Sequence, residues 1–114
     1  MEIQPQEIIL YTTRIGDCPF QKWLESLRDR EARSRIRIRL ARLEMGSFGD
    51  FKAVGEGVQE LRMKYGPGYR LYFARDGQRI VVLLCGGDKK SQKQDIIKAK
   101  QYWIDFQEKE DADS

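Results

Sequence analysis

The spacing of apolar residues changes several times along the chain, and each change marks an expected helix or strand. Residues 7–13 are β-branched and aromatic, so they predict a first strand. Asp17 then offers an N-cap, with Pro19 inside the first turn, and this pattern predicts a helix that continues to about Leu27. The chain is therefore expected to begin with a strand that leads into a helix.

A second helix is predicted over residues 30–45, where apolar side chains recur at helical spacing. One stripe of this helix should face the core, and Gly46 stands just past its end, as is typical of a C-terminal stop. The residues of the stripe are Ala32, Ile36, Leu40 and Leu43.

From residue 51 onward the apolar period becomes two, in short runs separated by glycine, proline and aspartate. This alternation predicts an antiparallel meander of four strands, at residues 51–54, 58–65, 69–75 and 79–85. Ser91, followed three residues later by Gln94, then forms a capping box that starts a final helix. The acidic tail from Glu108 is expected to fray.

This order predicts an α+β fold with one domain over residues 1–114, an N-terminal helical hairpin, and the helices packed on one side of an antiparallel sheet. With its longest uninterrupted apolar run at residues 80–85, the chain should not cross a membrane, and we expect it to be cytoplasmic. Two distant cysteines without metal-ligand spacing favour reduced thiols and no metal or cofactor.

The hairpin at residues 58–75 is expected to place basic side chains on its open face. Side chains alternate across a strand, so both apolar faces reach one core only if the loop is odd, which favours Tyr65 opposite Tyr69. Lys64 then opposes Arg70, and Arg62 opposes Tyr72. Like charges directly opposite each other destabilise a sheet, so this pairing indicates a site that grips phosphates.

Tyr72 on this open face could stack on an unpaired base. The alternative interpretation is a lysine- and arginine-rich face that only keeps the protein soluble and blocks edge pairing. The turn at residues 86–90 favours the functional interpretation, because its glycines admit a ligand and Lys89 and Lys90 enter just before a helix N-terminus, where anions bind.

The formal net charge of +3 is unevenly distributed. Residues 27–43 contain seven arginines and carry +5, which leaves −2 on the rest of the chain. Arg35, Arg39 and Arg42 flank the core stripe of the second helix, where they either contact RNA or cover the edge of the core with their stems. A second, partly apolar stripe on the outer face is a candidate partner groove, with Ile38, Ala41 and Met45 as its contact residues.

The chain contains no histidine, which removes the commonest proton shuttle and the Ser–His–Asp scheme. Acid–base chemistry would have to use lysine, arginine, tyrosine or carboxylates. If the chain cleaves RNA, Arg62 and Arg70 would stabilise the phosphorane charge, Lys64 would serve as base, and Lys89 or Tyr72 would serve as acid.

Two blocks of the sequence carry a resemblance to a known family, GVQELRMKYGPGYRLYF at residues 57–73 and LLCGGDKKSQKQDIIKAK at residues 83–100. The sequence resembles the RelE/ParE superfamily of toxins from type II toxin–antitoxin modules, in its addiction-module killer, phage-derived or HigB-type branch. By position, Arg70 looks like the family's phosphate-stabilising arginine, and Lys89 or Lys90 falls near its second arginine. Residues 92–95 depart from the pattern, since ribosome-dependent members carry a tyrosine there.

The resemblance implies a single RelE-like domain and toxicity through ribosome-dependent mRNA cleavage or, as an alternative, through DNA gyrase. A non-catalytic RNA-binding or interaction module is a further alternative, of a different class. The resemblance also implies a cognate antitoxin, which we expect to be a small helix-turn-helix protein, alongside ribosome and mRNA. The candidate catalytic residues are Arg62, Lys64, Arg70, Tyr72 and Lys89. The candidate RNA-binding residues are Arg35, Arg39, Arg42 and Lys90, and the candidate antitoxin contacts are Ile38, Ala41 and Met45.

Overall fold

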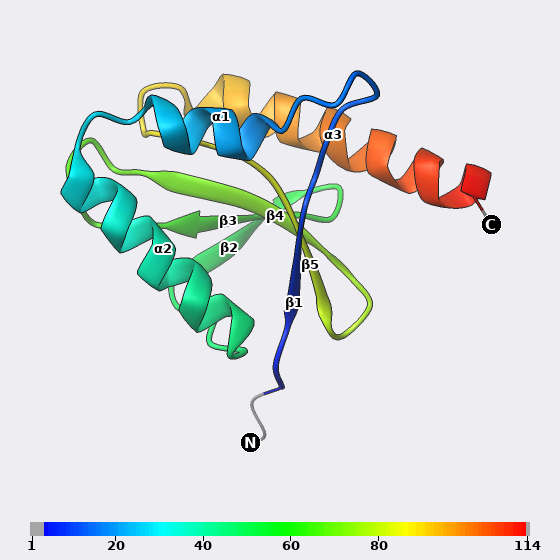
Figure 1. The fold of residues 1–114 in the computed structure, drawn as a ribbon, viewed down its shortest axis with the longest axis horizontal. Helices are drawn as coiled ribbons and strands as arrows, with labels where there is room; N and C mark the ends of the chain where they lie inside the picture. The colour runs from blue at the N-terminus through cyan, green and yellow to red at the C-terminus, as the bar shows by residue number, and fades with distance from the viewer. Residues whose placement is uncertain (1–3, 114) are drawn as a thin grey trace.

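A computed structural model describes residues 4–113, in which three helices surround one sheet (Figure 1). The elements follow the predicted order of a strand, two helices, four strands and a helix. Their bounds are β1 Glu7–Leu10, α1 Pro19–Ser26, α2 Arg30–Glu44, β2 Phe51–Gly55, β3 Val58–Arg62, β4 Arg70–Asp76, β5 Ile80–Gly87 and α3 Gln92–Asp113.

The five-stranded sheet has the order β1-β5-β4-β3-β2. The strands β2 to β5 form the predicted antiparallel meander, because each pairs with the next in sequence. The first strand adds an unpredicted feature, since β1 lies parallel to β5 with Glu7 opposite Ile80 and Leu10 opposite Leu83. The mostly antiparallel α+β architecture is therefore confirmed, with one parallel edge strand.

Helices cover both faces of the sheet. On one face, α1 and α2 bury Phe20 and Ile36 against Leu71 and other side chains of β3, β4 and β5. On the opposite face, α3 packs Trp103 in a second cluster that includes Tyr72 and other side chains of β3, β4 and β5. The prediction that all helices pack on one side of the sheet is wrong, because α3 covers the strand side chains that point away from α1 and α2.

The hairpin of β3 and β4 pairs in a register that differs by two residues from the expected one. Arg62 lies opposite Arg70 and Glu60 lies opposite Tyr72, so the expected pairs of Lys64 with Arg70 and of Arg62 with Tyr72 are wrong. The parity is as predicted, but β3 ends earlier than predicted, at Arg62, and β4 begins one residue later, at Arg70. The tight turn closes with the Gly68 amide donating to the Tyr65 carbonyl, and the chain from Lys64 onward leaves the ladder.

The helix ends follow local chemistry only in part. Asp29 caps α2 by accepting from the Glu31 and Ala32 amides. The N-cap of α1 is Cys18 rather than the predicted Asp17. Ahead of α3, the Ser91 side chain bonds to Asp88 and Asp95, so the predicted capping box with Gln94 is replaced.

The last helix continues through the acidic tail that was expected to fray from Glu108, and it ends at Asp113. Its C-terminal end extends beyond the sheet in Figure 1. Lys109 on this part of α3 donates to the Thr12 carbonyl, which ties the helix to the segment after β1. Within residues 4–113, no helix combines the length and the apolar character needed to cross a membrane.

Candidate functional site

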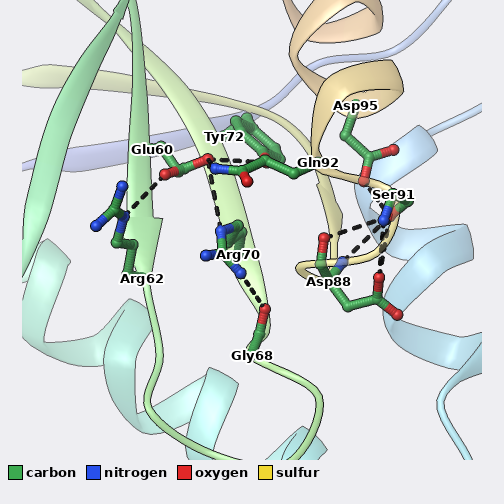
Figure 2. A network of polar contacts seen from close by, with 9 residues as sticks. All are labelled: Glu60, Arg62, Gly68, Arg70, Tyr72, Asp88, Ser91, Gln92 and Asp95. Carbon is green, nitrogen blue, oxygen red and sulfur yellow. Dashed lines mark hydrogen bonds and ion pairs between the residues drawn. The ribbon is translucent and has the colours of Figure 1, made fainter.

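The side chain of Glu60 lies at the centre of a buried polar cluster at the ends of β3 and β4 (Figure 2). Glu60 has no exposed surface, although it belongs to a strand whose charged side chains were expected to face solvent. Its carboxylate accepts hydrogen bonds from Arg62 Nε at 3.0 Å, from Tyr72 Oη at 3.1 Å and from Gln92 Nε2 at 2.9 Å. We call these residues, together with Arg70, the Glu60 cluster.

Arg70 approaches the same carboxylate from the neighbouring strand. Its Nε lies 3.7 Å from Glu60 Oε2, close enough for an ion pair but too far for a hydrogen bond, so this buried nitrogen lacks a hydrogen-bond partner. Its Nη1 donates to the Gly68 carbonyl at 2.6 Å. The side chain is 12% exposed, against 36% for Arg62, so Arg62 is the more accessible of the two cations.

The surroundings of Glu60 keep its carboxyl ionised. Burial alone raises the pKa of this group, but hydrogen bonds from Gln92, Arg62 and Tyr72 and the charge of Arg70 outweigh burial and hold the pKa below its ordinary value. Two guanidinium groups therefore share one carboxylate, which leaves excess positive charge at this end of the sheet.

Tyr72 cannot stack on a base in this structure. Its side chain is fully buried and its hydroxyl donates to Glu60. Burial and the neighbouring carboxylate also raise the pKa of the phenol, which opposes its ionisation. The expectation of an exposed Tyr72 is wrong because α3 covers the face of the sheet on which it lies.

The structure separates Lys64 from the two arginines with which it was predicted to act. Lys64 follows the end of β3, is exposed, and lines a groove between α2 and residues 63–65 with a volume of about 410 Å³. We call this the α2 groove. Its lining residues are Glu31, Arg35, Ile38, Arg39, Arg42, Met63, Lys64 and Tyr65.

The three candidate RNA-binding arginines of α2 meet in this groove, but two of them have internal partners. Arg39 donates to the Arg62 and Asp50 carbonyls at 2.8 and 3.0 Å, so it fastens α2 to the sheet, and burial lowers its pKa. Arg35 pairs with Glu31 at 3.0 Å and lies over the Tyr65 ring at 4.4 Å. Arg42 stays exposed.

The three candidate antitoxin contacts lie on the outer side of α2 and at its C-cap. Ile38 is 50% exposed and Met45 is 70% exposed, and Ala41 lies between them on the same side of α2. Of these residues, Ile38 lines the α2 groove. The stripe and the groove therefore form one continuous surface.

Lys89 and Lys90 are exposed in the loop between β5 and α3. Gly68 brings Lys89 close to Arg70, because a Cβ atom at Gly68 would lie 3.4 Å from Lys89 Cβ and 3.2 Å from Arg70 Nη1. The helix N-terminus itself is already occupied by a carboxylate, since Asp88 accepts from the Ser91 amide at 3.0 Å. Lys89 thus lies beside the turn that holds Arg70, whereas the Asp88 carboxylate occupies the helix N-terminus, where an anion was predicted to bind.

A second concave region, with a volume of about 480 Å³, lies between α1, the end of β5 and the start of α3. Its lining includes Trp23, Asp88, Asp95 and the buried thiol of Cys85. Burial raises the pKa of Cys85 to about 12, so this thiol is unreactive near neutral pH. Among the described residues, no group of three or more possible metal-binding side chains is close enough to hold an ion.

Glu60 is the site residue that the sequence analysis overlooked. Alternation assigned it to the face of Arg62 and Lys64, and no role was assigned to it there. The signal that could have found it is β5, whose unbroken apolar run indicates burial on both faces of the sheet. On a doubly covered sheet, a carboxylate near the centre of a strand must be paired.

Comparison with known proteins places this chain in a family. The family described as Phage derived protein Gp49-like (DUF891) matches residues 22–103, which include α2, all strands of the meander and the first part of α3. A protein of Haemophilus influenzae described as "Uncharacterized protein" is 46% identical over 81 residues, which cover 71% of this chain and 82% of that protein. The chain belongs to the Gp49-like family of phage-derived proteins.

Proposed function

We propose that this chain is the toxin of a type II toxin–antitoxin module and that it inhibits translation by cleaving mRNA on the ribosome. The resemblance of its two sequence blocks to RelE/ParE toxins supports this function, as does its membership of a phage-derived family. A cognate antitoxin, a small helix-turn-helix protein, would silence it in the cytoplasm.

The observation that carries the proposal is the pair of cross-strand arginines on one carboxylate. Arg62 and Arg70 lie directly opposite each other and both form ion pairs with Glu60, and Lys89 lies beside the Gly68 turn that holds Arg70. Their excess charge suits a phosphate whose negative charge increases during cleavage. Arg62 would make the first contact because it is the most accessible member of the cluster.

The acid and base roles differ from those that were assigned from the sequence. Lys64 lies in the α2 groove and Tyr72 is buried, so neither is placed to exchange a proton with RNA at the cluster. Lys89 keeps the proposed role of acid. The carboxylate of Glu60 lies nearest to both arginines, but it is buried and its pKa is lowered, so it is a weak base. Cleavage should therefore depend on the ribosome to orient the message.

The test is a translation extract supplied with the purified protein, in which mRNA 5′ ends are mapped. Wild-type protein should cut within codons, and both Arg70→Ala and Lys89→Ala should reduce the cut ends by about 100-fold, as expected for loss of a charge-stabilising or acidic group. Lys52→Ala is the matched control, because Lys52 is an exposed cation on β2 outside the cluster. Undiminished cutting by folded Lys89→Ala and Arg70→Ala would reject this site.

A second function, a non-nuclease toxin directed at DNA gyrase, is favoured by the burial of Tyr72 and the displacement of Lys64 from the arginines. These two positions leave the free chain without an exposed base beside Arg62. Intact mRNA together with accumulating cleaved DNA in growth-arrested cells would select this alternative. Steeply salt-dependent RNA binding that leaves RNA whole would instead indicate the non-catalytic binding module.

A further inference from the structure

We propose that the α2 groove is a protein-docking site for an acidic, amphipathic helix of a partner. The groove is lined by the apolar side chains of Ile38 and Met63 and by the cationic side chains of Arg35, Arg42 and Lys64. Naming the antitoxin as the source of that helix rests on the proposed function, whereas the chemistry of the occupant follows from the groove itself.

The apolar part of the surface is arranged for a helix. Ile38, Ala41 and Met45 are exposed and lie three and four residues apart, so they form one line along α2. Met63, which is 9% exposed and belongs to the core, contributes to the groove lining from the segment after β3. Apolar residues at such spacing on an exposed helix are the usual contact surface of a second amphipathic helix.

The cationic lining supplies charge that the chain itself does not neutralise. Arg42 and Lys64 line the groove from opposite sides, and neither side chain makes a hydrogen bond or an ion pair with any residue in the described range 4–113. Glu31 is the acidic residue of the lining, and Arg35 already pairs with it. A partner with glutamate or aspartate beside its apolar stripe would pair with both free cations.

The same contacts disfavour RNA as the occupant. The Arg39 guanidinium donates to backbone carbonyls of the chain, so few of its N–H groups remain for phosphates. The Tyr65 ring, which could have stacked on a base, is covered by Arg35, and its hydroxyl donates to Asp29 at 2.9 Å. Exposed Ile38 offers RNA neither a hydrogen bond nor a stacking plane.

The size of the groove also suits a helix. Its lining on α2 runs from Glu31 to Arg42, a rise of about 17 Å at roughly 1.5 Å per residue. A partner helix of about three turns would cover this length. Such a segment buries one apolar face and keeps its outer face in solvent.

The experiment uses two labelled synthetic peptides of about 18 residues, each with five helical turns. One has leucine at i, i+4 and i+7 with glutamate on the flanking positions, and the other contains the same residues in an order without an apolar face. Fluorescence anisotropy with the full chain should show at least about 10-fold tighter binding of the amphipathic peptide, a difference of about 1.4 kcal/mol. Equal binding of both peptides would mean that the groove acts only as a charged surface, and it would overturn the proposal.

Variants locate the binding on the surface. Ile38→Asp and the double variant Arg42→Glu with Lys64→Glu should each weaken the amphipathic peptide by at least about 10-fold. Arg37→Glu is the matched control, because Arg37 is exposed on α2 and outside the groove lining, and it should bind as wild type does. Wild-type affinity of the Ile38→Asp chain would overturn the proposal even if the charge variants bind weakly.

A single-stranded RNA oligonucleotide is the third probe. If it binds more tightly than the amphipathic peptide, and Arg42→Glu with Lys64→Glu abolishes that binding, the groove is an RNA site and the protein-docking inference fails. The outcome is separate from the mRNA-cleavage test, since Ile38, Arg42 and Lys64 lie outside the Glu60 cluster.

Discussion

At Glu60, the cost of burying a charge is offset by four partners on three elements. Arg62 lies two residues away on β3, Tyr72 and Arg70 come from β4, and Gln92 comes from the first turn of α3. Because those partners converge, the carboxylate fixes the position of both arginines and of the N-terminal end of α3. The cluster therefore joins fold stability to the candidate chemistry through one side chain.

Replacing Glu60 by glutamine should lower the free energy of unfolding by about 3 kcal/mol, because both arginines lose their counter-charge in a largely buried setting. Urea denaturation followed by circular dichroism measures this loss. Glu7→Gln is the control, since Glu7 is exposed on β1 and should change stability by less than about 0.5 kcal/mol. An equal loss in both variants would contradict the role given to the cluster.

The stability difference between wild type and Glu60→Gln should depend on pH. The pKa of Glu60 is lowered in the folded chain, so its ionised form contributes stability above its ordinary pKa of 4.5, and this contribution is lost as the pH falls through the folded value. Unfolding curves at about pH 7 and about pH 3 should therefore show a large difference and a small one, respectively. A constant difference would mean that Glu60 acts through packing rather than charge.

At the scale of elements, the helices and strands were predictable because their periodicity and end signals are local. Strand bounds differ by one to three residues, and the hairpin register by two, because the Gly66–Pro67–Gly68 turn is part of a wider loop that no residue pattern specified. The register error also changed the predicted site, because the register decides which cations lie opposite each other. In the structure Arg62 lies opposite Arg70, and Lys64 lines the α2 groove instead.

The glycine pair at the end of β5 is where two helices approach the same strand from opposite faces. A Cβ atom at Gly86 would collide with the Trp23 ring of α1, and one at Gly87 would collide with the Asp95 carboxylate of α3. Neither glycine has a positive φ, so the restriction is steric. The sequence analysis read these glycines as room for a ligand, whereas the structure uses them for close helix packing.

Gly86→Ala and Gly87→Ala should each destabilise the chain by about 1–3 kcal/mol, because a helix must move away from the sheet. Gly86→Ala should also shift the fluorescence of Trp23. The comparison variant is Gly16→Ala, where nothing lies within 4 Å and only the backbone conformation, with φ of +89°, is strained. It should leave the tryptophan spectrum unchanged, and a shared spectral shift would contradict the steric explanation.

At the scale of the whole molecule, the sheet is an internal layer between two sets of helices. Parity along β4 correctly separated Leu71 and Phe73 from Tyr72 and Ala74, but parity alone cannot say whether the second set meets solvent or another helix. That choice depends on how α3 returns across the sheet, which is a long-range contact. This is why the fold class followed from the sequence and the burial of Tyr72 did not.

Trp103→Ala should reveal how much stability this second core supplies. Trp103 is 8% exposed and packs with β3 to β5, so its loss should cost about 3–5 kcal/mol in urea unfolding. Ile104→Ala, on the same helix and 50% exposed, should cost less than about 1 kcal/mol. Similar losses for the two variants would show that α3 contributes little burial to the sheet.

The parallel pairing of β1 with β5 determines when the sheet of a newly synthesised chain can be completed. Strand β1 leaves the ribosome first, but its partner is the last strand of the meander, so its place in the sheet stays empty until most of the polypeptide has been synthesised. The loop that closes at that moment spans almost the whole meander and both early helices, which makes closure slow. The parallel edge of the sheet is therefore the last part of the sheet that a growing chain can assemble.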